Sequence, residues 1–129
     1  MNEQENKEMK RQAQQKLAGE IEKVMLHHEA ENLQWQGTTI DLMEAAYVAF
    51  TTCKLQNDEG EYLSFISIAR NVCRILHVTL PANPYEVAAR GLRRKGFRRH
   101  PFMDRYLLKI NRQPNSHPLW EQIAPAANR

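Results

Sequence analysis

The chain has 129 residues, of which 42% are hydrophobic and 26% are charged. That length suits one folded domain, and the composition is too apolar for a chain that is disordered throughout. The sequence has no run of about 18 apolar residues that could span a membrane, and its first residues are too polar for a secretory signal. We therefore expect a cytoplasmic protein.

The net charge of +3 hides an uneven distribution along the chain. Residues 1–62 carry 6 Lys or Arg and 12 Asp or Glu, a net charge of −6. Residues 63–129 carry 12 Lys or Arg and 3 Asp or Glu, a net charge of +9. The segment 90–112 is the most basic, with nine Lys or Arg and Asp104 as its one acid. Because like charges at this density repel one another, the segment predicts a polyanionic partner, nucleic acid before membrane.

Residues 3–31 have apolar side chains at spacings of three and four, which predicts a charged helix with a narrow apolar stripe. Such a helix either packs on its own domain or pairs with a second copy as a homodimer, and we keep both interpretations. We treat residues 1–34 as a separate N-terminal segment. The stripe consists of Met9, Ala13, Leu17, Ile21, Val24, Met25 and His28.

Two helices are predicted in the middle of the chain. Thr38 and Asp41 form a T-x-x-D capping signature, and the helix that they begin should run to about Lys54. Asp41 and Glu44 lie on one face of its first turn, and we interpret them as acids that favour the helix dipole rather than as a catalytic pair. Residues 63–76 have a helical apolar period and form the next helix.

The clearest local signal is Asn83-Pro84-Tyr85-Glu86, which supplies an N-cap, a proline in the first turn and an acid after it. The predicted helix covers 84–96 and ends at Gly96. Its two sides should differ in character. We expect Tyr85, Ala88, Ala89 and Leu92 to face the core, and Arg90, Arg93 and Arg94 to face outward.

A last core helix should open at Pro101, and residues 114–129 form a proline-containing tail in which Trp120 docks a short helical turn. The fold class is therefore all-α, with about five helices. The segments 63–77 and 84–96 match a helix-turn-helix pair, which makes 35–113 the expected DNA-binding domain. We expect DNA contacts from Arg90, Arg93, Arg94, Lys95, Arg98, Arg99, Arg105 and Lys109.

Other interpretations concern partners and chemistry. The acidic N-terminal region could cover the basic face within the chain or across a dimer. The chain would then be a non-enzymatic interaction module or a dimeric adaptor whose basic face binds an acidic partner. No phosphate-binding glycine loop, metalloprotease motif or nucleophile elbow is present, so we expect no enzyme activity and no cofactor. Cys53 and Cys73 lack C-x-x-C spacing and are interpreted as reduced, packed thiols. Cys73 and His77 could supply two zinc ligands on one helix face, but two ligands do not make a site.

Residues 35–112 resemble the RteC family, regulators of the excision of conjugative transposons. The resemblance rests on Trp35 and Gly37, D-L-M-E-A-A-Y at 41–47, the run 66–68, R-R-K at 93–95, Arg99, and F-M-D at 102–104. It covers about 78 of the 129 residues.

The resemblance implies a cytoplasmic DNA-binding transcriptional activator with a helix-turn-helix or winged-helix-like C-terminal part. Carried over to this chain, the DNA contacts of the family fall on Arg93, Lys95 and Arg99. The chain departs from the family at His100-Pro101, which replaces a polar pair. Its N-terminal region is also shorter, at about 34 residues, and no strand pair for a full wing is visible after residue 96.

Overall fold

In the computed structural model, residues 2–94 and 100–125 are described, and they form five α-helices and one small sheet. The expected all-α fold is confirmed. The helices are α1 (Glu3–Met25), α2 (Thr39–Thr51), α3 (Phe65–Leu76), α4 (Pro84–Leu92) and α5 (Phe102–Arg112). Short 3-10 turns cover Glu29–Glu31 and Trp120–Gln122, and the strands are β1 (Leu33–Trp35) and β2 (Ile123–Pro125).

The local capping signals produce the helix starts that the sequence predicts. The Thr38 hydroxyl accepts a hydrogen bond from the backbone N–H of Asp41, 3.1 Å away, at the start of α2. The Asn83 side chain accepts from the N–H of Glu86, 3.2 Å away, at the start of α4. Each cap satisfies a backbone donor that has no partner inside its helix. The helix α4 ends at Leu92, earlier than the expected end at Gly96, because Arg93 and Arg94 are not helical; Gly96 itself lies outside the described residues.

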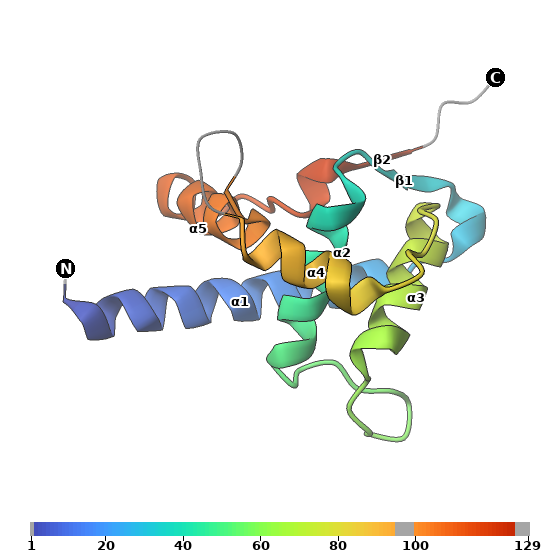
Figure 1. The fold of residues 1–129 in the computed structure, drawn as a ribbon, viewed down its shortest axis with the longest axis horizontal. Coiled ribbons are helices and arrows are strands. Elements are labelled where there is room, and N and C mark those ends of the chain that lie inside the picture. Colours follow the sequence, from blue (N-terminus) through green and yellow to red (C-terminus); the bar gives the residue numbers. More distant parts are fainter. Residues whose placement is uncertain (1, 95–99, 126–129) are drawn as a thin grey trace.

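The helix α2 occupies the centre of the molecule and packs against each of the other four helices (Figure 1). A helix surrounded in this way must be apolar on most of its circumference, and the alanines of α2 allow close neighbours. Its buried apolar residues are Leu42, Met43, Ala45, Ala46, Val48 and Ala49. Side chains from all three expected segments share the one core around it, although the functional division into 1–34, 35–113 and 114–129 stays a prediction.

The first helix packs on its own chain over only part of its length. From Ala13 onward, α1 buries side chains against α2, α3 and α5. Residues 3–12 include no buried residue, and this end extends away from the helical core (Figure 1). His28, expected in the apolar stripe, is exposed and caps the 3-10 turn that follows. Pairing of α1 with a second copy remains a prediction.

A buried carboxylate attaches the C-terminal tail to α1. Glu20 is 3% exposed, and it accepts a 2.6 Å hydrogen bond from the hydroxyl of Tyr106 on α5. It also accepts from the backbone N–H groups of Leu119 and Trp120. Just beyond, β2 pairs antiparallel with β1, which the sequence did not predict. The tail therefore docks more firmly than a single helical turn would allow.

The structure does not show a helix-turn-helix pair. Residues 77–83 connect α3 to α4, but α4 packs mainly along α2. It meets α3 where the ring of Tyr85 lies 4.7 Å from that of Phe65. In the described part of the chain, the pairing of β1 with β2 is the sole sheet, and it joins segments before α2 and after α5 rather than forming a wing beside α4.

Replacing Tyr106 with Phe should remove a pH dependence of stability. Burial, and then the hydrogen bond to Glu20, raise the pKa of the Tyr106 phenol. A phenol with a raised pKa binds its proton more tightly in the folded state, so stability is lost as the pH rises above about 10, where the unfolded chain deprotonates. Urea unfolding between about pH 8 and pH 11 should show a steeper loss for the wild type than for Tyr106→Phe. Parallel losses would contradict this assignment.

Candidate nucleic-acid interface

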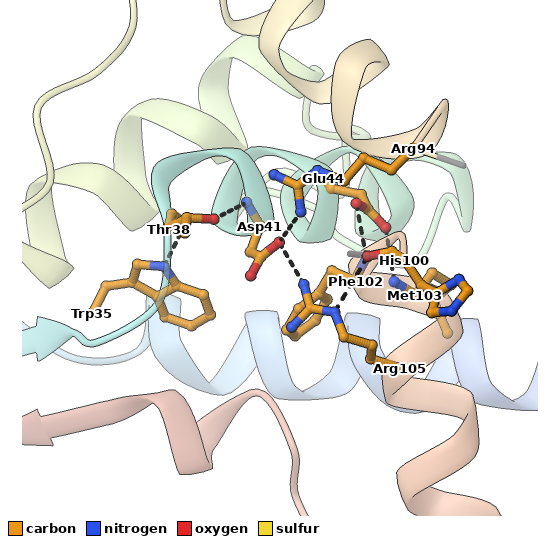
Figure 2. A network of polar contacts seen from close by, with 9 residues as sticks. All are labelled: Trp35, Thr38, Asp41, Glu44, Arg94, His100, Phe102, Met103 and Arg105. Carbon is orange, nitrogen blue, oxygen red and sulfur yellow. Dashed lines mark hydrogen bonds and ion pairs between the residues drawn. The ribbon is translucent and has the colours of Figure 1, made fainter. Parts of the chain in front are cut away.

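Two carboxylates in the first part of α2 organise the region where the basic residues lie. Asp41 is 2% exposed and Glu44 is fully buried. The sequence suggested that they serve the helix dipole, but both point toward α4 and α5 and have specific partners there (Figure 2). Sequence periodicity could not reveal this role, because the partners are more than 50 residues away along the chain.

Asp41 binds two of the expected DNA-contacting arginines. Its Oδ1 lies 3.0 Å from Nη1 of Arg94 and 2.7 Å from Nη2 of Arg105. The Nε of Arg105 also donates to the carbonyl of His100, 3.3 Å away, and its guanidinium lies over the ring of Phe102. These contacts connect the end of α4, the start of α5 and the first turn of α2 (Figure 2).

Glu44 takes the place of a side-chain cap for α5. The residue before this helix is Pro101, which makes no capping hydrogen bond. Instead, the two carboxylate oxygens of Glu44 accept from the backbone N–H groups of Phe102 and Met103, at 3.0 and 2.7 Å. Burial, helped by the nearby Asp41 carboxylate, raises the pKa of Glu44, whereas these two hydrogen bonds oppose the rise. The start of α5 is therefore already occupied by an internal anion.

A glycine allows α4 to approach these carboxylates. A Cβ atom on Gly91 would lie 2.8 Å from Oε1 of Glu44 and 3.0 Å from Cγ2 of Ile40. The carboxylate cannot move aside without losing its hydrogen bond to Phe102. Close packing of α4 on α2 thus requires a residue with no side chain at this position.

The eight predicted DNA contacts have different surroundings in the structure. Arg94, expected to face outward, is 17% exposed at its side chain and turns inward to Asp41. Arg105 is also engaged by Asp41. Two further pairs are exposed: Arg93 with Glu86 at 3.5 Å, and Lys109 with Glu121 at 3.1 Å. Arg90 is exposed on α4, and Lys95, Arg98 and Arg99 lie outside the described residues.

Acids from outside the segment 90–112 pair with several of its basic residues. These acids belong to α2, to the first turn of α4 and to the C-terminal 3-10 turn, whereas Asp104 is the one acid within the segment itself. Among the described residues, Asp41 of the acidic half pairs with Arg94 and Arg105 of the basic half, and Glu29 pairs with Arg74.

The outward face of α4 is more apolar than expected. Its buried residues are Pro84, Val87, Ala88 and Gly91. Tyr85 and Leu92, expected in the core, are 50% and 39% exposed. Together with Tyr47 of α2 they line an open groove of about 370 Å³. The buried side of α4 includes Gly91, which a pattern of apolar side chains does not reveal because glycine has none.

The described residues show no metal site, and their two cysteines differ in exposure. Residues 2–94 and 100–125 contain no group of three His, Cys, Asp or Glu side chains arranged for a metal ion. Cys73 is buried, which raises the pKa of its thiol to about 11. Cys53, expected to be packed, is exposed. No helix among these residues has the length and apolar character required to cross a membrane.

Comparison with protein families, curated proteins and solved structures finds no match to this chain. The resemblance to the RteC family therefore stays a prediction.

Replacing Asp41 with Asn should destabilise the fold substantially. The change leaves Arg94 and Arg105 without their anion, and breaking a buried ion pair in this way costs about 3–5 kcal/mol. Because the side chain of Arg105 is 37% exposed and water can reach it, we expect the lower end of that range. Urea unfolding at neutral pH measures the loss. Asp58→Asn, in an exposed turn, is the control and should change little; equal effects would show that Asp41 has no special role.

Proposed function

We propose that this protein is a cytoplasmic, non-enzymatic DNA-binding transcriptional regulator that presents the exposed face of α4 to the major groove. The observation that carries the proposal is the exposure of Arg90 on the outward side of a short, capped helix and of Arg93 at the C-cap of that helix. The inner side of that helix is fixed on α2 through Gly91. A rigid helix with outward arginines suits the major groove, where Arg donates two hydrogen bonds to guanine.

The surroundings of α4 also favour a polyanionic partner. Residues 63–129 have a net charge of +9, and the five residues between Arg94 and His100 include Lys95, Arg98 and Arg99. Asp41 and Glu44 hold the residues on either side of that segment. Phosphate contacts from such residues would position the protein without reading sequence. The resemblance to the RteC family adds the proposal that the regulated genes concern excision of a conjugative transposon.

The salt dependence of binding tests the electrostatic part of this proposal. If about five phosphates are neutralised, log K for a duplex should fall with log[salt] with a slope of about −4.5. Arg90→Ala should make the slope less steep by about 0.9 if this residue meets a phosphate, or relax the preference for one base pair if it reads a base. Arg11→Ala on α1 is the control, because it removes the same charge outside the basic region. A salt-independent affinity would contradict the proposal.

A second candidate is a protein-interaction module, and two observations favour it. Internal acids already pair with four of the predicted DNA contacts, which reduces the free positive charge of the basic face. The exposed Tyr85 and Leu92 border an open groove, and exposed aromatic and aliphatic side chains of this kind are common at protein interfaces. The partner would then be an acidic protein or a second copy of the chain.

Size-exclusion chromatography with light scattering, combined with a duplex shift assay, separates the two candidates. The interaction module predicts a dimer or a stable protein complex and no duplex shift at physiological salt. A variant lacking residues 2–11 tests the α1 contribution, because no described residue in this range is buried. Loss of a dimer in this variant would implicate α1, whereas loss on Tyr85→Ala would implicate the groove. A monomer that shifts duplex DNA would favour the first candidate.

A further inference from the structure

An acid lies in the first turn of α4, on the side that this helix would present to DNA. Glu86 is one of three acids in residues 63–129. Its side chain is 56% exposed, and Oε1 lies 3.5 Å from Nη2 of Arg93, the C-cap residue that follows α4 seven positions further along the chain. Residues 86, 90 and 93 fall on one side of an α-helix, because four and seven residues correspond to about one and two turns.

Folding stability accounts for little of this arrangement. An exposed ion pair contributes weakly, because water screens it and two long side chains must be held in place. The start of α4 is already served by the Asn83 side chain and by Pro84, and Glu86 in the first turn adds only a small, solvent-screened interaction with the helix dipole. On a surface that meets phosphates, in contrast, an acid beside an arginine is a clear cost, since the carboxylate repels the backbone and competes for the guanidinium.

An unfavourable charge of this kind helps a DNA-binding helix to reject incorrect base sequences. A carboxylate in the major groove accepts a hydrogen bond from the amino group of cytosine. Adenine also has an amino group there, but its neighbouring N7 acceptor repels a carboxylate. A group that is repelled at most sites and satisfied at one is a standard means of discrimination. Accepting from cytosine would also release Arg93 for a neighbouring guanine or phosphate.

We infer that Glu86 is a specificity-determining residue of the DNA-facing helix, which selects cytosine in the major groove and keeps Arg93 from binding phosphates indiscriminately. The inference rests on the proposed function, since it requires that α4 faces duplex DNA. It differs from that proposal in predicting that removal of one side chain strengthens binding to random DNA while it weakens sequence preference.

Glu86→Gln is the informative variant, and Asp104→Asn is its matched control. Both residues are exposed acids in the first turns of neighbouring helices, and both changes raise the net charge by the same amount. The change at 86 keeps the size of the side chain, and circular dichroism and thermal unfolding of both variants would establish that they fold. Wild type and variants are compared in a selection from a random duplex library and in titrations with one random duplex.

Glu86→Gln should bind the random duplex at least about threefold more tightly than Asp104→Asn, because the charge that it removes lies at the interface. It should also lose at least about fivefold preference for cytosine at one position of the selected site. Equal gains in the two variants, or an unchanged selected sequence, would overturn the inference while leaving DNA binding intact. Failure of the wild type to bind any duplex would instead refute the proposed function, and this inference with it.

Discussion

The arrangement of α4 and α5 depends on two buried carboxylates at the start of α2. Asp41 holds Arg94 and Arg105, and Glu44 holds the first two N–H groups of α5 (Figure 2). Both are nearly or fully inaccessible to water, where an unpaired charge would be strongly unfavourable. Their partners are therefore essential to the fold. The same contacts hold residues on either side of Lys95, Arg98 and Arg99 in the sequence.

This arrangement separates the basic residues into groups with different roles. Arg94 and Arg105 act mainly inside the protein, because Asp41 binds both. Arg93 and Lys109 have exposed acidic neighbours that a stronger anion would displace at small cost. Arg90 is exposed on α4. A count of positive charges in the sequence treats these residues alike, although burial and pairing make them very different as ligands for a phosphate.

A similar principle operates at the other end of the molecule. Glu20 of α1 accepts from Tyr106 and from the backbone of the C-terminal turn. A buried acid again connects elements that are far apart in the sequence. Because each of these carboxylates has several donors, the core tolerates charge without exposing it. The chain thus connects elements that are distant in the sequence through the buried carboxylates of Glu20, Asp41 and Glu44.

The sequence by itself determined the local structure. Thr38 and Asn83 begin helices because their side chains satisfy nearby N–H groups, an interaction that needs only residues three positions apart. Apolar periodicity predicts the all-α class and the helix at 65–76, because this pattern also depends only on residues that are close in the sequence. Tertiary structure decided which face of α4 is buried, since Gly91 is a contact point only when α2 lies beside it. It also decided the inward roles of Asp41, Glu44 and Arg94 and the pairing of β1 with β2, because their partners meet only after the chain has folded.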